Sequence, residues 1–231
     1  MKRLVVLTGA GISAESGLMT FRDAGGLWEN HSIEDVATPE GWRKDPALVL
    51  KFYNDRRAKA CEASPNAGHR ALVELEKYFE VYIITQNVDN LHEKAGSTNV
   101  MHLHGELTKV RSVKNENLIT DIGGKAIEIG DLAEDGEQLR PHIVWFGEMV
   151  PMIEDAAEIS AEADIFVVVG TSLQVYPAAG LVGYANKAIP KFIIDPHTPD
   201  VSSHYKNVTY ITETATVGVP QLAELLIRDF Q

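Results

Sequence analysis

Apolar runs alternate with amphipathic stretches along most of the chain. Five short runs, rich in β-branched and aromatic residues, have the composition of buried parallel strands. They are residues 4–7, 81–84, 165–169, 191–194 and 208–211. Because helical stretches separate these runs, the pattern predicts an α/β fold, a doubly wound parallel sheet covered by helices on both faces.

Helical spacing is clearest in two of the stretches outside these strands. One helix is expected to open with Ser64 as its N-cap and Pro65 in its first turn. Its inner face would carry Leu72, Leu75 and Phe79. A last helix is expected over 220–230, with its leucines on one face. Shorter helices are expected near Ser13 and around Phe52.

Two irregular regions break this rhythm and are expected to form a smaller module beside the sheet. The first is polar and acidic, and its segments 118–121 and 126–129 flank a pair of glycines, which predicts a β-hairpin. The second contains Trp28 and Trp42. We therefore expect one domain over 1–231. Its core is expected at about 1–23, 65–106 and 141–231, with insertions at about 24–64 and 107–140.

Charge and cysteine content narrow the classes of protein to consider. The 231 residues include 33 acidic and 21 basic side chains, a net charge of -12, which argues against a nucleic-acid-binding surface. No apolar run approaches the roughly 20 residues of a membrane span, and the first strand begins so early that no cleavable signal is expected before it. The single cysteine, Cys61, excludes an internal disulfide. We expect a cytoplasmic protein.

A glycine-rich turn follows the first strand. Gly9 and Gly11 let the backbone turn tightly and approach a ligand, and a helix starting near Ser13 would direct free N–H groups at the same point. Such a turn suits a phosphate. The spacing departs from the dinucleotide fingerprint G-x-G-x-x-G because Ala14 stands at the third glycine. An ordinary strand–helix turn therefore explains these glycines equally well.

Polar residues also follow the later strands, at the edge where open α/β sheets bind ligands. They are Gln86, Asn87, Asp89, Gly170, Thr171, Ser172 and Asp195. His104 lies in the segment 101–106, and its imidazole suits removal of a proton from a hydroxyl near neutral pH. A histidine with only structural hydrogen bonds gives the same pattern. The alternation of His102 and His104 also resembles a metal-binding pair, but we expect no metal ion here.

Six motifs occur here in the order that they have in sirtuins, and the chain resembles that family over nearly its whole length. They are GAGIS at 9–13, TFR at 20–22, QNVD at 86–89, HGEL at 104–107, RPHIVWFGE at 140–148 and GTSLQVYPAA at 170–179. The resemblance implies a sirtuin-type catalytic domain with a Rossmann-like core. It also implies an NAD-dependent protein deacylase that consumes NAD as a co-substrate and acts on acylated lysines of proteins or peptides, and it leaves the oligomeric state open.

The resemblance further implies roles for the matching residues. His104 would be the catalytic base, acting through the ribose hydroxyls with Asn87 beside it, after the acyl oxygen attacks the ribose carbon and nicotinamide leaves. Water would then release free lysine and O-acyl-ADP-ribose. NAD binding is implied for Gly9, Ala10, Gly11, Ser13, Glu15, Thr20, Phe21, Arg22, Trp28, Gln86, Asn87, Asp89, His104, Gly170, Thr171, Ser172 and Asp195. Acyl-lysine and peptide binding are implied for Ala37, Tyr53, Arg56, Val144, Trp145, Phe146, Gly147 and Val175.

The chain departs from the family pattern at two places. Most sirtuins carry four zinc-binding cysteines between the HGEL and RPHIVWFGE motifs, but residues 108–139 contain no cysteine or histidine, and Ser112 stands about where the first ligand is expected. We therefore expect no zinc, with Ile119, Ile127 and Ile129 organising the module instead. Asp195 replaces a common asparagine, and its carboxylate disfavours NADP.

The segment 52–56 resembles the bacterial and mitochondrial branch that removes acidic acyl groups. Tyr53 and Arg56 are spaced to share one face of a helix, where they would bind the carboxylate of a succinyl or malonyl group, and Ala37 would leave room for it. Most helical arginines instead pair with a nearby acid, here Asp55, and Arg57 is an alternative acyl partner.

Three other functions use part of the same sequence pattern. A mono-ADP-ribosyltransferase would share the NAD chemistry, and a non-catalytic module would bind NAD or ADP-ribose without turnover. A hydride-transferring dehydrogenase would share the glycine-rich turn but would not explain the HGEL and QNVD segments. Nicotinamide release with an acyl-peptide separates these alternatives from a deacylase that acts on acetyl, succinyl and malonyl groups.

Overall fold

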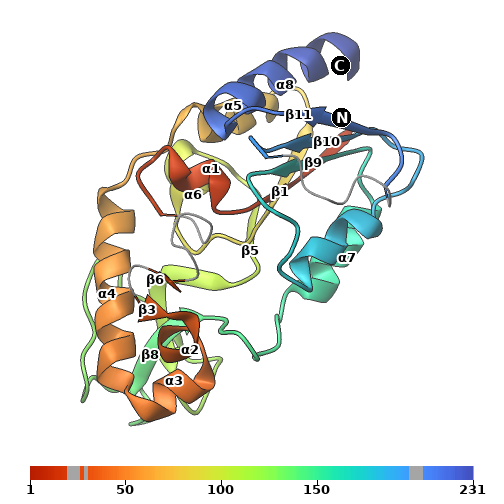
Figure 1. The fold of residues 1–231 in the computed structure, drawn as a ribbon. Helices are drawn as coiled ribbons and strands as arrows, with labels where there is room; N and C mark the ends of the chain where they lie inside the picture. The colour runs from red at the N-terminus through yellow and green to blue at the C-terminus, as the bar shows by residue number, and fades with distance from the viewer. Residues whose placement is uncertain (20–26, 29–30, 198–204, 231) are drawn as a thin grey trace.

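The computed structural model describes residues 1–19, 27–28, 31–197 and 205–230 (Figure 1). Six of the described strands form one parallel sheet in the order β11-β10-β9-β1-β4-β5. Their bounds are β1 Arg3–Thr8, β4 Glu80–Thr85, β5 Val100–His102, β9 Ile165–Val169, β10 Lys191–Ile194 and β11 Val208–Ile211. All five predicted strands are confirmed, and the short β5 is additional. The strand order reverses between β1 and β9, which is where doubly wound sheets bind ligands.

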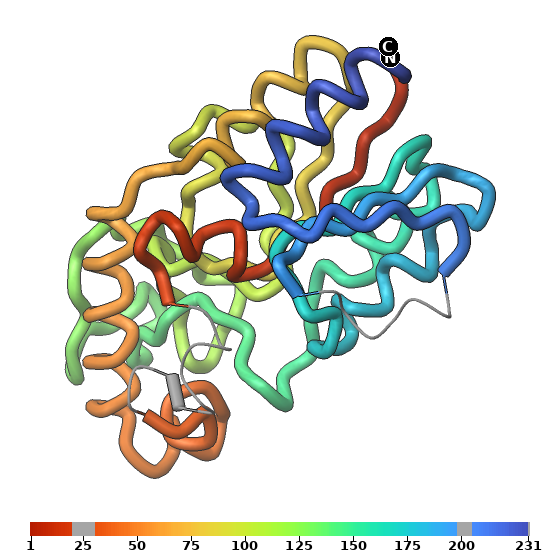
Figure 2. The backbone as a smooth tube through the Cα atoms, turned by 45° about the horizontal axis from the view of Figure 1, so that its top comes forward, coloured from red at the N-terminus to blue at the C-terminus, as the bar shows by residue number. Residues whose placement is uncertain are grey.

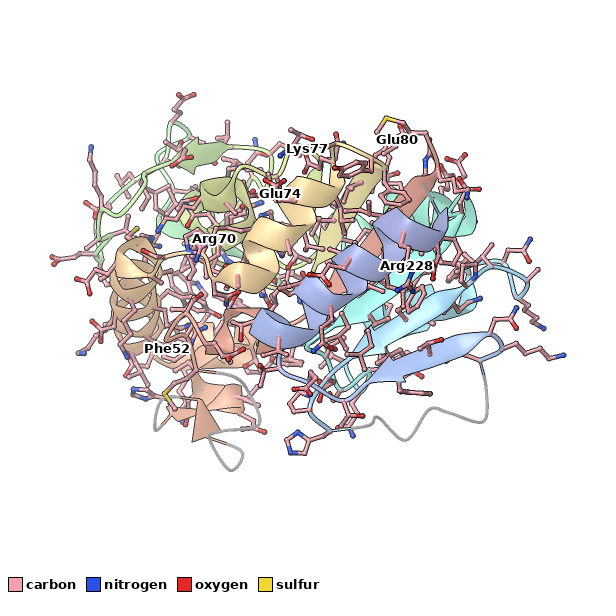
Figure 3. The ribbon with its side chains drawn as sticks, turned by 90° about the horizontal axis from the view of Figure 1, so that it is seen from above. Phe52, Arg70, Glu74, Lys77, Glu80 and Arg228 are labelled. Atoms are coloured by element: carbon pink, nitrogen blue, oxygen red, sulfur yellow. The ribbon has the colours of Figure 1, made fainter. Side chains whose placement is uncertain are left out.

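Helices cover both faces of this sheet, as the sequence predicts. On one face lie α5 (Ala67–Leu75) and α8 (Ala215–Phe230), which run side by side in Figures 2 and 3. On the other face lie α7 (Ile153–Ala161) and the 3-10 helix η1 (Ala178–Gly183). Alternate residues of β1 serve the two cores, since Leu4 and Val6 pack under α5 and α8 while Val5 and Leu7 pack under α7 and η1.

Both predicted helix starts are wrong, for reasons of local packing. Helix α5 is capped by Asn66 rather than Ser64, because the Asn66 side chain accepts a hydrogen bond from the Gly68 N–H and also reaches the Ile12 carbonyl. Helix α8 begins at Ala215 and contains Pro220, which the sequence pattern places at its start. Burial of Val219 with the later leucines favours the longer helix.

The remaining large elements form a small module of helices α2–α4 and strands β6–β8, which lies apart from the parallel sheet in Figure 1. Its helices are α2 (Ile33–Val36), α3 (Pro39–Lys44) and α4 (Pro46–Glu62), and its strands are β6 (Gly105–Ser112), β7 (Ile119–Asp121) and β8 (Leu139–Ile143). The strands make an antiparallel sheet in the order β7-β6-β8. Short elements complete the described fold: α1 (Gly11–Ala14), β2 (Leu27–Trp28), β3 (His31–Ser32) and α6 (Leu91–Ala95).

The predicted hairpin over 118–129 is wrong, because β7 pairs with β6 and residues 126–129 form no strand. The side chain of Asn54 on α4 takes the place of a strand partner there. It accepts a hydrogen bond from the Ile127 N–H and donates one to the Ile127 carbonyl. Ile127 is buried, whereas Ile119 and Ile129 are exposed, so one of the three expected isoleucines is part of a core.

The domain bounds stay a prediction, although β8 crosses the expected boundary at 140. Among the described residues, no helix combines the length and the apolar character needed to cross a membrane.

Candidate active site

A cavity of about 570 Å³ lies where the strand order reverses, and its walls come from both the parallel sheet and the small module. Two glycine turns meet at one end of it. The Gly9 N–H donates to the Val169 carbonyl and the Gly11 N–H donates to the Gly170 carbonyl. A Cβ on Gly11 would lie 2.6 Å from the Gly170 Cα, so this contact admits only glycine. Helix α1 begins here at Gly11, slightly earlier than expected.

Beside these turns, the polar residues after β1, β4 and β9 bond to one another. Asn87 donates from Nδ2 to the Ser13 hydroxyl, 3.1 Å away, and that hydroxyl donates to Asp89 Oδ2 at 3.1 Å. Gln86 donates from Nε2 to the Thr171 hydroxyl. Burial raises the pKa of Asp89, and its hydrogen bonds to Leu91 and Ser13 oppose that rise. The predicted strand-end residues therefore form one polar wall of the cavity.

His104 lines the same cavity, two residues after the end of β5. Its Nδ1 lies 3.1 Å from the Gln86 carbonyl oxygen, which only accepts, so Nδ1 carries the proton and Nε2 keeps its lone pair. Burial lowers the pKa of His104, and the carbonyl hydrogen bond opposes that effect only in part. The imidazole is thus neutral at pH 7 and has a basic nitrogen available for proton transfer.

The end of the cavity in the small module brings together the predicted acyl-binding residues. Tyr53 and Arg56 lie one turn apart on α4, and both line the cavity. Trp145 donates from Nε1 to the Tyr53 hydroxyl at 3.1 Å, and burial raises the pKa of that phenol well above its usual value. Tyr53 therefore stays protonated, with its own O–H proton to donate.

The sequence offers Asp55 as a surface partner of Arg56, and Arg57 as an alternative acyl-binding residue. Both side chains bond elsewhere. Asp55, the expected surface partner, pairs with Lys51. Arg57 is fully buried under β6, where its Nε donates to the Leu107 carbonyl and its Nη1 donates to Asn54. Arg57 is also absent from the residues that line the cavity. Of the two arginines, Arg56 is the one in position to meet an acyl group.

Sequence reasoning missed an ion pair that supports this wall. Arg140 makes a two-pronged contact with Glu148, at 2.7 and 3.2 Å, and its guanidinium lies 3.3 Å from the centre of a Trp145 ring. Glu148 also accepts from the Trp145 N–H. Both charges occur in the RPHIVWFGE motif, but nothing in a linear spacing of eight residues indicates the pair.

The other predicted residues that the structure describes also line the cavity. They are Ala10, Glu15, Ala37, Val144, Phe146, Gly147, Ser172, Val175 and Asp195. Thr20, Phe21 and Arg22 lie outside the described residues, as does the side chain of Trp28, whose backbone belongs to β2. Thr214 and Ala215 also line the cavity, and sequence reasoning missed them. They follow β11 at the same sheet edge, so the search for residues after each strand would have found them if it had included this strand.

The position of the first expected zinc ligand holds a hydrogen-bonded turn. Ser112 is buried, donates to Asp135 Oδ2 at 2.7 Å and accepts from the N–H groups of Lys114 and Asn115. In the part of the chain that the structure describes, no three histidine, cysteine or carboxylate side chains are grouped to hold a metal ion. The residues present therefore do not fit the structural zinc of most sirtuins.

By contrast, the cavity fits NAD. The close contact of two glycine turns leaves backbone at its wall, where a pyrophosphate can approach, and the buried Asp195 carboxylate lies at the end of β10, where it can accept from ribose hydroxyls. The other end of the cavity reaches the Tyr53 and Arg56 side chains, so one cavity has room for a nucleotide and an acyl-lysine.

Several known proteins are similar to this chain over most of its length. The model of the Sir2 family matches residues 9–177. The chain is 55% identical to the NAD-dependent protein deacylase of Bacteroides thetaiotaomicron, over 98% of this chain and 99% of the relative. It is 47% identical to the protein of the same name from Vibrio cholerae, over 98% and 94%. The structure of a Sir2 homologue in complex with NAD superimposes with a TM-score of 0.88 at 38% identity, over 100% of this chain and 91% of that one. The chain therefore belongs to the Sir2 family, the sirtuins.

Proposed function

We propose that this sirtuin, an NAD-dependent protein deacylase, removes succinyl and malonyl groups as well as acetyl groups from protein lysines, in the cytoplasm. The observation that carries the proposal is the placement of Tyr53 and Arg56 in the cavity that also contains His104. A protonated phenol and a guanidinium are both hydrogen-bond donors, and together they suit a carboxylate at the end of an acyl chain. The single cysteine suits the reducing cytoplasm.

The donor geometry of Tyr53 supports an acidic substrate. Because its hydroxyl accepts from Trp145, its own proton is left to point elsewhere, and the raised pKa keeps that proton in place at neutral pH. The ion pair of Arg140 and Glu148 positions Trp145, because Glu148 accepts from the Trp145 N–H and the Arg140 guanidinium stacks on the indole ring. Ala37 is small and lines the same end of the cavity, which leaves room for a longer acyl group.

For catalysis, NAD supplies the ribose carbon that receives the acyl oxygen and the nicotinamide that leaves. We assign pyrophosphate binding to the turn at Gly9–Gly11 with Ser13, and the adenosine side to Gly170–Ser172 and Asp195. Asn87 and Asp89 would hold the nicotinamide ribose, since Ser13 already ties their side chains together. His104 takes a proton from a ribose hydroxyl at Nε2, the nitrogen that its bond to the Gln86 carbonyl leaves unprotonated.

Replacing Arg56 by Met tests the acyl preference. We expect succinyl-peptide turnover to fall by the equivalent of about 1.5–3 kcal/mol, the usual worth of a charged hydrogen bond, while acetyl-peptide turnover changes little. Arg43→Met is the matched control, because Arg43 is exposed on α3 and pairs with the exposed Glu40. Product formation is followed by mass spectrometry.

Equal losses on both peptides, or wild-type indifference to succinyl-lysine, would contradict the acidic-acyl preference and leave a deacetylase. Transfer of ADP-ribose to protein, or NAD binding without nicotinamide release, would instead favour one of the other functions that share this sequence pattern.

A further inference from the structure

His102 is a buried histidine beside the active site, and it has no role in the proton transfer assigned to His104. It is the last residue of β5, where it pairs in register with Thr85 at the end of β4. Its side chain is only 7% exposed. The imidazole therefore lies directly under the loop that carries Gln86 and Asn87.

Both ring nitrogens of His102 contact groups that only accept hydrogen bonds. Nδ1 lies 2.9 Å from the Asn87 carbonyl oxygen, and Nε2 lies 2.8 Å from Glu93 Oε1 on α6. A neutral imidazole has one N–H and satisfies one of these contacts, whereas an imidazolium has two and satisfies both. His104 differs because a single acceptor, the Gln86 carbonyl, faces its Nδ1.

The charged groups around His102 favour the cation. Glu93 and the neutral His92 face it from α6, Asp89 faces it from the loop after β4, and Glu106 faces it from β6 beside Lys109. Burial lowers the pKa of His102, but the hydrogen bond and charge of Glu93, the Asn87 carbonyl and Glu106 together raise it above the ordinary value. The pKa of His104 is lowered, because its burial outweighs the hydrogen bond to the Gln86 carbonyl.

We propose that His102 is a positioning residue that acts as a buried cation, held by Glu93, and that it anchors the carbonyl of Asn87 while the neutral His104 anchors the carbonyl of Gln86. Two histidines in opposite charge states would thus fix consecutive peptide groups of one loop. Asn87 is then held at three points, since Thr85 accepts from its N–H and Ser13 accepts from its side chain.

The two charge states set opposite limits on activity. His104 must be neutral to accept a proton, so activity rises with pH through its lowered pKa. His102 must be charged to keep both hydrogen bonds, so activity falls as pH rises through its raised pKa. The inference rests on deacylation and not on the acyl preference. Every variant is therefore assayed with acetyl and succinyl peptides, which His102 should affect equally and Arg56 should not.

Two substitutions of His102 separate its contacts. Asparagine places Nδ2 as many bonds from Cα as the Nδ1 of histidine. His102→Asn therefore keeps the hydrogen bond to the Asn87 carbonyl and loses the one to Glu93, and its side chain does not titrate. Glutamine places Nε2 like the Nε2 of histidine, so His102→Gln keeps the Glu93 contact and loses Asn87. We expect His102→Gln to lose about ten- to a hundredfold in kcat/KM, the size of effect that a misplaced active-site group produces. His102→Asn should stay within a few fold of wild type and lose the alkaline fall.

Glu93→Gln should move the alkaline fall to lower pH, because an amide accepts the hydrogen bond without stabilising the cation. The matched control is Glu74→Gln. Glu74 stands on the outer side of α5, bonded to Lys77, as labelled in Figure 3. This exposed change should leave the pH profile unaltered.

The protonation state of His102 is measured directly by nitrogen-15 NMR of the wild-type histidine side chains, with His102→Asn used for assignment. We expect both ring nitrogens of His102 to carry protons at pH 7. A neutral His102 at pH 7, or a folded His102→Gln enzyme with wild-type kcat/KM, would overturn the proposal. If the variants do not fold, which circular dichroism detects, the wild-type spectrum and Glu93→Gln decide the matter.

Discussion

At the scale of single residues, hydrogen-bond partners decide which chemistry each side chain of the site is able to do. His104 has one carbonyl partner, which sets its tautomer and leaves Nε2 basic. Tyr53 accepts from an indole N–H, which leaves its own proton as a donor. In both cases the partner is a group with a single hydrogen-bonding role, so the protonation of the active-site side chain follows from it.

Replacing His104 by Tyr should abolish most turnover while leaving NAD affinity nearly unchanged, because the proposed task of the imidazole is proton transfer after nicotinamide departs. The expected loss is on the order of 10²–10⁴-fold, the usual contribution of a general base. Nicotinamide release measures turnover, and calorimetry with NAD measures binding. Full turnover by a correctly folded His104→Ala protein would show that another group is the base.

At the scale of elements, the small module is joined by contacts that take the place of a metal. Ser112 organises the turn after β6 through Asp135 and two backbone N–H groups. Asn54 satisfies both backbone groups of Ile127 and so ties an irregular segment to α4. The side-chain oxygen of Asn54, Oδ1, also accepts from Nη1 of the buried Arg57.

Removal of metal should therefore have no effect on this module, whereas loss of the Asn54 contacts should. We expect no stoichiometric zinc by elemental analysis and no change of melting temperature with a chelator. Asn54→Ala should lower the free energy of unfolding by about 1–3 kcal/mol, the cost of leaving buried polar groups unpaired. Lys125→Ala, an exposed change in the same segment, is the control. Tightly bound zinc at one ion per chain would contradict the prediction.

At the scale of the whole molecule, the cavity is shared by the two parts of the fold. Its lining includes Gly9 and Thr171 at the edge of the parallel sheet, and Tyr53 and Trp145 from the small module and the segment after β8. One hydrophobic core lies against the parallel sheet and another lies in the small module. A ligand that spans the cavity therefore touches residues that are held in place by both cores.

ADP-ribose, a part of NAD, should stabilise the folded chain, because the folded protein alone offers this cavity. At a concentration 100-fold above its Kd the expected gain is about 2.7 kcal/mol. For a chain of this length each kcal/mol raises the melting temperature by about 2–4 °C. Differential scanning calorimetry measures the shift, with AMP at equal concentration as the control. Absence of any shift at saturating ADP-ribose would contradict the assignment of the cavity.

The sequence by itself determined five of the six strands of the parallel sheet, the presence of helices on both faces and the polar residues at one edge of the cavity. The physical reason is that a buried strand is a local pattern, and parallel strands place their carboxyl ends at one edge. Polar residues that follow such strands, among them Asn87, Asp89 and Thr171, therefore meet in space. Family motifs added Tyr53 and Arg56, which no periodicity would have connected to the nucleotide end.

The tertiary structure alone decided which partners these residues have. The contact of the α5 cap with Ile12 and the contact of Asn54 with Ile127 depend on groups far apart in the chain. So does the burial of Arg57 under Leu107. The pairing of β7 with β6 and the two acceptors around His102 join segments that are nearer in the chain but whose meeting no periodicity indicates. A linear pattern specifies which side chains are polar or apolar. Hydrogen bonds and charge states depend on distances of about 3 Å, which only the folded chain sets.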